Sequence, residues 1–256
     1  MNKQRWLRFS WVLLAWLALT SCRKEPTDRF QGYVEGEFVY VSSPLPGTLE
    51  KLSVRRGDQI AAGQPLFTLD ETRERAARDE AQAALTMSQA DFKRQGELYR
   101  SGPAAAQDFD RARSTRDQDR ERLNQAEWNL AQMRQAAPQA GLVFDTLFRE
   151  GEWVAAGKPI VALLPPPNIK VRAFVPQTVV GTLHVGQATQ VMVDGVVDPF
   201  PGKISFISPR AEFTPPVIFS RESRSKLVFM IEMVFEPSVA AKLHPGQPVD
   251  VYFITG

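Results

Sequence analysis

Side chains able to carry out chemistry are few and scattered along this 256-residue chain. Cys22 is its only cysteine, so no disulfide can form within one chain. His184 and His244 are its only histidines, and they stand 60 positions apart. Each histidine stands two residues before a glycine in a short segment typical of a turn, and each is isolated from other metal-ligating residue types. These residues predict neither a metal site nor a cofactor.

The place of Cys22 points instead to export and lipid attachment. Lys3, Arg5 and Arg8 precede an apolar stretch over residues 9–19, as in a secretory signal peptide. This stretch is shorter than the roughly 20 residues that a spanning helix needs. Leu-Thr-Ser-Cys22 then resembles a bacterial lipobox, so we expect a signal peptide over 1–21, a lipid on Cys22, and a linker over 22–39. A plain signal peptide or an uncleaved anchor are the alternatives.

An internal repeat is the most informative feature of the sequence. Residues 47–69 match residues 141–163 at a fixed offset of 94 positions, and Ala-Ala-Gly-x-Pro recurs whole. We interpret the shared glycines as turn positions and each shared proline as the start of a strand. The repeated positions are Gly47, Gly57, Gly63 and Pro65 in the first copy and Gly141, Gly151, Gly157 and Pro159 in the second. The halves, 40–70 and 138–166, are each too small for a core, so we predict that they pair into one flattened barrel.

Residues 71–137, between the two halves, have the composition of helix. Ala, Arg, Gln, Glu and Leu dominate, and glycine and proline stay near the middle of the segment. Small and apolar residues recur at spacings of three and four, which predicts an antiparallel coiled-coil hairpin. One seam is Arg78, Ala81, Leu85, Ser88, Phe92, Gln95 and Tyr99; the other is Phe109, Ala112, Arg116, Asp119, Leu123, Ala126, Leu130, Met133 and Ala137.

The segment 167–256 has a β-rich pattern. Residues 169–175 alternate apolar and polar side chains, and 190–193, 202–207, 227–235 and 249–254 are further strand candidates. We predict a β-barrel domain with a short helix over 179–183.

The split repeat around a helical insert resembles a biotinyl/lipoyl domain opened by a hairpin, as in the HlyD-like membrane-fusion, or periplasmic adaptor, family. The resemblance implies a mainly β fold: a split lipoyl-like flattened barrel, an inserted coiled-coil hairpin and a C-terminal β-barrel. It also implies a non-enzymatic adaptor in the periplasm, anchored to the inner membrane. Such a protein links an inner-membrane transporter to an outer-membrane duct and associates with itself in a ring.

The family's duct-docking tip pattern matches at Arg94, Leu98 and Gly102, whereas Ala105 stands where the family has serine. The alternative is that Leu98 only packs the hairpin end and Arg94 is a surface charge. An ABC-type transporter is favoured, because no residues follow the last barrel strand for the extra domain usual with resistance-nodulation-division pumps. Those pumps and major-facilitator transporters stay possible partners. Nucleic acid is not expected, since the net charge of +2 is spread over interleaved acidic and basic residues.

The sequence leaves three other functions to compare with the adaptor. A biotinyl or lipoyl carrier needs a lysine on a tight hairpin between the halves, and Lys93 lies inside a helix instead. A hydrolase would need convergent groups, whereas Glu71–Glu74 and Glu232–Glu236 are expected on solvated surfaces. A pump-independent periplasmic scaffold or binding lipoprotein stays open.

Overall fold

The computed structural model describes residues 29–102, 106–212 and 227–254. The chain divides into two compact units: one combines the chain up to Glu35 with Lys170–Gly256, and the other is Gly36–Ile169.

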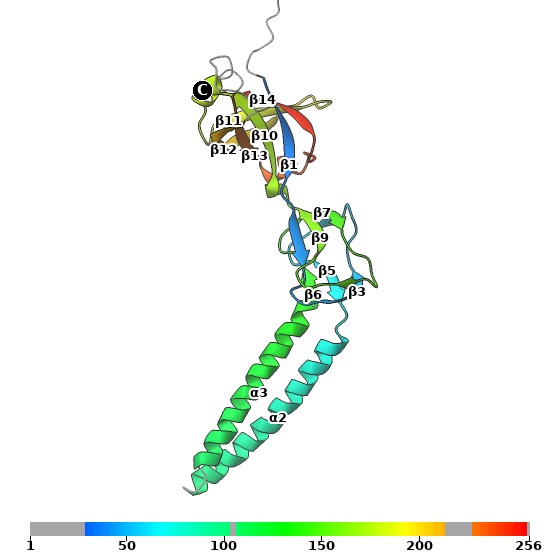
Figure 1. Ribbon diagram of the computed structural model, residues 1–256, viewed down its shortest axis with the longest axis vertical. Helices are drawn as coiled ribbons and strands as arrows, with labels where there is room; N and C mark the ends of the chain where they lie inside the picture. The colour runs from blue at the N-terminus through cyan, green and yellow to red at the C-terminus, as the bar shows by residue number, and fades with distance from the viewer. Residues whose placement is uncertain (1–28, 103–105, 213–226, 255–256) are drawn as a thin grey trace, which may run out of the picture. The chain divides into compact units, whose positions relative to one another are not determined.

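The unit Gly36–Ile169 is built on two four-stranded antiparallel sheets (Figure 1). The first has the order β2-β9-β7-β4 and the second β6-β5-β3-β8. Their bounds are β2 Val39–Ser42, β3 Gly47–Leu52, β4 Gln59–Ile60, β5 Pro65–Leu69, β6 Arg134–Ala136, β7 Gly141–Thr146, β8 Trp153–Val154 and β9 Pro159–Leu164. One buried apolar cluster takes side chains from both sheets, among them Leu49, Leu66, Val143 and Leu163, so the core lies between them.

The two sheets are equivalent under the 94-residue offset, which turns β2 into β6, β9 into β5, β7 into β3 and β4 into β8 with the same neighbours. The backbone hydrogen bonds between the repeats are reciprocal. Gly57 N donates to Val143 O at 2.8 Å, and Gly151 N donates to Leu49 O at 2.8 Å. Each sheet therefore mixes strands from both repeats, and neither repeat can complete a sheet alone.

Two long helices lie between β5 and β6 in the chain. α2, Thr72–Ser101, leaves β5, and α3, Ala106–Gln132, leads into β6; the two helices lie side by side (Figure 1). β5 and β6 are hydrogen-bonded neighbours, so the sheet brings the two helix bases together. The residues that become buried along the helices fall on the predicted seams: Leu85, Ser88, Ala112, Asp119 and Leu123.

The predicted end of the helical insert at residue 137 is wrong. α3 ends at Gln132, and Arg134–Ala136 form β6. Met133 and Ala137, which we predicted as helix seam positions, are buried in the sandwich core. A longer helix would satisfy the same backbone groups, but the strand conformation pairs residues 134–136 with β5 and lets Met133 and Ala137 enter the apolar core.

The other unit is a closed six-stranded barrel in the order β1-β10-β13-β12-β11-β14. Its strands are β1 Phe30–Gly36, β10 Ile169–Pro176, β11 Ala188–Val193, β12 Phe200–Glu212, β13 Val228–Val234 and β14 Pro248–Phe253. Its short helices are α4 Gln177–Val180 and α6 Pro237–Ala240, and a 3-10 turn of the other unit, η3 Pro166–Asn168, precedes β10. The strands predicted here are confirmed with shifted ends, and the short helix begins two residues earlier than predicted.

The linker predicted over residues 22–39 is wrong for Phe30–Gly36, because this segment is strand β1 and pairs with β14. The barrel has its own two-fold repeat, in which β1 stands in the place equivalent to β12. Gly186 N donates to Ile204 O of β12 at 2.8 Å, and Gly246 N donates to Val34 O of β1 at 2.8 Å. Phe30-Gln-Gly32 in β1 likewise matches Phe200-Pro-Gly202 in β12.

We predict that Gly32→Ala destabilises the barrel. A Cβ at Gly32 would lie 2.4 Å from Arg172 O, so β1 would have to move off β10. We expect a loss of about 1–3 kcal/mol in the free energy of unfolding, measured by urea denaturation. Gly102→Ala is the control, since nothing lies within 4 Å of the Cβ it would add. Equal stability of the two variants would contradict the role of β1 in closing the barrel.

Candidate functional site

The distal end of α2 presents the residues predicted to dock a partner. Arg94 and Leu98 are four residues apart and so share one face of the helix. The Arg94 side chain is 68% exposed, with Nη1 3.5 Å from Asp91 Oδ1, and Leu98 is 51% exposed. Gly102 ends the helix in an extended conformation, with its N–H donating to Leu98 O at 3.2 Å. Ala105, the fourth predicted tip residue, lies outside the described residues, as does Cys22.

Aromatic stacking joins the two helices beside this face. The Phe109 ring of α3 stacks on Phe92 at a centroid distance of 5.1 Å and on Tyr99 at 5.3 Å. Gly96 lies beside this ring, and a Cβ there would be 3.4 Å from Phe109 Cε2, at the limit of ordinary van der Waals contact. Arg116 adds a cation–π contact, with Cζ 4.1 Å from the Phe92 ring centroid. Phe92, Tyr99 and Phe109, with Arg116, are here named the aromatic ladder. This ladder joins α2 to α3 along the part of α2 that carries Arg94 and Leu98. In the sequence, Gly96 between two aromatic seam residues was the signal for it.

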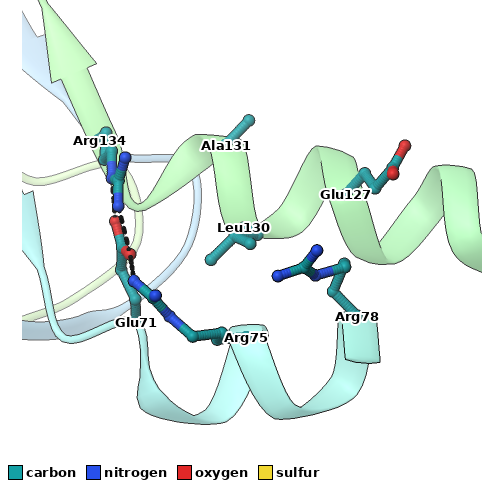
Figure 2. Close-up of a pocket in the computed structure, with 7 residues that line it drawn as sticks. All are labelled: Glu71, Arg75, Arg78, Glu127, Leu130, Ala131 and Arg134. Atoms are coloured by element: carbon teal, nitrogen blue, oxygen red, sulfur yellow. Dashed lines mark hydrogen bonds and ion pairs between the residues drawn. The ribbon is translucent and has the colours of Figure 1, made fainter. Parts of the chain in front are cut away.

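A buried carboxylate holds the other end of the helix pair (Figure 2). Glu71, directly before α2, accepts hydrogen bonds from Arg134 Nη2 at 2.8 Å, from Arg134 Nε, and from Arg75 Nη2 at 2.7 Å. Glu71 is 5% exposed, whereas both arginine side chains are more than half exposed. The hydrogen bonds from Arg134 have the largest effect and lower the pKa of Glu71; burial opposes them, and the hydrogen bond from Arg75 lowers the pKa further. The sequence-based expectation of a solvated Glu71 is therefore wrong.

This Glu71 clamp ties the start of α2 to β6, the strand that follows α3. A cleft of about 400 Å³ lies beside it, lined by Glu71, Arg75, Arg78, Glu127, Leu130, Ala131 and Arg134 (Figure 2). Glu71 and Arg134 stand 63 residues apart, so no local pattern indicated the pair.

The repeated glycines and prolines fall into two groups. Gly57, Gly63, Gly151 and Gly157 all have positive φ, between 73° and 94°, as expected for turns that favour glycine. Pro65 and Pro159 begin β5 and β9, as predicted. Gly47 and Gly141 differ from the prediction, because they begin strands β3 and β7. At Gly141 a Cβ would lie 2.9 Å from Leu164 O, so this glycine permits close strand packing.

The remaining residues that could carry out chemistry make contacts within turns and ion pairs instead. His184 and His244 occupy equivalent turns, and each backbone N–H donates to the side chain of the glutamine three residues on, at 3.3 and 3.4 Å. Glu232 is not solvated as expected: it accepts hydrogen bonds from Lys170 Nζ at 3.0 Å and Arg172 Nε at 2.9 Å. Burial raises the pKa of Glu232, but these hydrogen bonds outweigh it and leave the pKa below its ordinary value.

Among the described residues, no three His, Cys, Asp or Glu side chains gather as metal ligands would. In that same part of the chain, no helix combines the length and the apolar character needed to cross a bilayer.

Comparisons with known proteins agree with this architecture. No family model matches the chain. It is 27% identical to a UPF0194 membrane protein of Citrobacter koseri, over 87% of each chain. It is also 27% identical to the UPF0194 membrane protein YbhG of Salmonella gallinarum, again over 87% of each chain.

Solved structures show the same fold. A MacA-MexA chimeric protein containing the Pseudomonas aeruginosa MexA α-hairpin domain matches with a TM-score of 0.72 at 19% identity, covering 88% of this chain and 79% of the chimera. The membrane fusion protein Spr0693 of Streptococcus pneumoniae matches with a TM-score of 0.68 at 19% identity, covering 89% of this chain and 99% of Spr0693. The fold is thus that of membrane fusion and periplasmic adaptor proteins, and the curated relatives are UPF0194 membrane proteins.

We predict that Glu71→Gln destabilises the unit Gly36–Ile169 by about 1–2 kcal/mol at neutral pH, because charge-assisted hydrogen bonds to two solvated arginines are lost. The exposed Glu80→Gln is the control. Because folding lowers the pKa of Glu71, its stabilising contribution is complete above the ordinary carboxyl pKa of 4.5 and is lost as the pH falls through the folded value. The stability difference between wild type and Glu71→Gln, followed by urea denaturation from pH 7 to pH 3, should therefore shrink with acidification. A difference that is independent of pH would contradict the clamp.

Proposed function

We propose that this chain is the periplasmic adaptor subunit of a tripartite efflux or secretion system, joining an inner-membrane transporter to an outer-membrane duct. The observation that carries the proposal is the pair of long helices that leaves a two-fold sandwich and presents Arg94 and Leu98 near its far end. The adaptor fold of the structural neighbours supports the same function.

The helix pair acts in this proposal as a spacer. α2 has 30 residues and α3 has 27, so at 1.5 Å per residue the pair spans about 40–45 Å. The Glu71 clamp fixes one end of the helix pair and the aromatic ladder fixes the other. A displacement at the tip is therefore transmitted along the helices to the two sheets. No step of this role requires a catalytic group.

The segment preceding β1 supplies the anchor in our proposal. A signal peptide over residues 1–21 directs export, and a lipid on Cys22 holds the periplasmic chain at the inner membrane. Copies of the chain then associate in a ring around the transporter, for which an ABC-type exporter is the expected class.

A lipoyl-type carrier is less well supported. The two halves are joined by α2 and α3 and not by a tight hairpin, and Lys93 lies within α2. A pump-independent scaffold could share the architecture, so capture of partners must separate it from an adaptor.

Docking is tested with a photoreactive residue at Leu98 of the full-length chain in living cells. We expect it to capture an outer-membrane duct protein, whereas the same residue at Met87, which is 74% exposed on the same helix, should not. Copurification then identifies the transporter class. Cross-links from Leu98 to copies of this chain alone, without a copurified transporter, would support the scaffold instead.

We also predict that Leu98→Asp weakens capture of the duct by about tenfold or more, since a charge would replace an apolar contact in the interface. Leu98→Met should retain capture, because it conserves size and apolar character. Retention by both variants would assign Leu98 to packing at the helix end.

Cys22→Ser should release the protein from the membrane fraction, which metabolic labelling with a clickable fatty acid and cell fractionation would detect. Fatty-acid label that persists in Cys22→Ser would place the lipid elsewhere. Membrane association that persists without label would indicate an uncleaved anchor.

A further inference from the structure

The cleft at the base of the helix pair gathers more positive charge than the Glu71 clamp uses. It lies where α2 and α3 separate toward the sheets (Figure 1), between Arg75 and Arg78 of α2 and Arg134 of β6. Glu71 and Glu127 are the acidic residues of its lining. Three arginines against two glutamates give the lining one net positive charge, which favours an anion in the cleft.

Glu71 fixes two of these cations without using all their donors. It accepts from Nε and Nη2 of Arg134 and from Nη2 of Arg75, whereas a guanidinium carries five N–H groups. Both arginine side chains are more than half exposed, so their other donors can reach a ligand. Because Glu71 already holds the two guanidinium groups, an anion that binds them pays little for ordering their side chains.

Arg78 is the third cation, and the protein satisfies it incompletely. Its Nε is buried and makes no hydrogen bond, although Asp79 Oδ1 lies 3.0 Å away. Figure 2 shows its terminal nitrogens directed toward Leu130 and draws no hydrogen bond or ion pair from Arg78 to the other lining residues. A guanidinium at a helix-seam position with unmet donors is costly, and an oxyanion in the cleft would supply acceptors.

The size and the remaining lining of the cleft indicate what else the ligand carries. Its volume of about 400 Å³ falls in the lower part of the range of small-molecule sites. Leu130 and Ala131 of α3 form an apolar part of the lining, which an inorganic anion alone would leave uncovered. An oxyanion joined to one compact apolar group therefore matches both parts of the cleft.

We propose that this cleft binds a small organic anion. Arg75, Arg78 and Arg134 hold its phosphate or carboxylate group, since guanidinium pairs with either through parallel hydrogen bonds, and the apolar part lies against Leu130 and Ala131. The bound anion joins α2 to β6 beside the Glu71 clamp. All the residues of the site belong to one copy of the chain, so the inference does not depend on the adaptor function.

Isothermal titration calorimetry of the full-length chain in a neutral detergent tests the site. We expect phenyl phosphate to bind saturably, with one molecule per chain. Inorganic phosphate should bind about tenfold more weakly or less, because it lacks the apolar group, and the uncharged phenyl β-glucoside should not bind. Absence of saturable phenyl phosphate binding, or equal binding of the glucoside, would overturn the proposal.

A matched pair of arginine variants identifies the site. Arg78→Gln should raise the dissociation constant of phenyl phosphate about tenfold or more, because a charge-assisted contact is lost. Arg73→Gln is the control, since Arg73 is exposed on the same helix and does not line the cleft. Phenyl phosphate should raise the melting temperature of wild type and Arg73→Gln more than that of Arg78→Gln. Equal affinities of the two variants would show that only the net charge matters and would overturn the proposal.

Leu130→Ala tests the apolar part of the site. We expect it to weaken phenyl phosphate binding severalfold and to leave inorganic phosphate binding unchanged, because only the first probe carries a ring. Unchanged discrimination between the two probes would overturn the assignment of Leu130.

The source of the anion is tested with a soluble short-chain phosphatidic acid, which carries a phosphate monoester on a lipid. Tighter binding of this lipid than of phenyl phosphate would identify a lipid headgroup as the ligand, and weaker binding would identify a free solute. In both cases Arg78→Gln should reduce the affinity. Anion binding that persists when Leu98 captures no duct would remove the adaptor function and leave this site in place.

Discussion

The exchange of strands between the two repeats is the constraint on which the larger unit depends. Each repeat supplies two strands to each sheet, and the reciprocal hydrogen bonds of Gly57 and Gly151 lock them together. Neither repeat has a core without the other. The 30-residue and 27-residue helices between them are therefore attached to a stable base only when both repeats are folded together. Pairing of Val39 in β2 with Leu163 in β9 joins residues from the two ends of this unit.

The helix pair depends on that support at both ends. β5 and β6 set the spacing of the two bases, and the Glu71 clamp connects them through side chains. At the far end, Phe109 inserts against Gly96 between two aromatic rings. Between these ends the seam contains buried polar residues such as Ser88 and Asp119. Leu85, Ala112 and Leu123 supply the buried apolar part of this seam, and the contacts at the two ends add to it.

The barrel is likewise completed by a strand from a distant part of the chain. Its two-fold repeat lacks a third strand in the second copy, and β1 supplies it from the other end of the chain. Gly32 and Gly202 occupy equivalent positions where a side chain would collide with a neighbouring strand or ring. Closure by β1 removes an exposed edge that could otherwise pair with other chains.

Local patterns in the sequence were sufficient to predict several features of the fold. The spacing of Gly57, Gly63 and their partners predicted the turns, the offset of 94 predicted the split domain, and three-four spacing predicted the buried side of each helix. These follow from backbone sterics and periodicity, which act over a few residues. Three other features could be seen only in the folded chain: Phe30–Gly36 joins the barrel, Met133 packs in the sandwich core, and Glu71 is buried against Arg134. Each of these features depends on residues that are far apart in the sequence and meet only when a sheet or barrel closes. The sequence does not show whether a carboxylate is hydrated or paired with an arginine, so the burial of Glu71 could not be predicted from it.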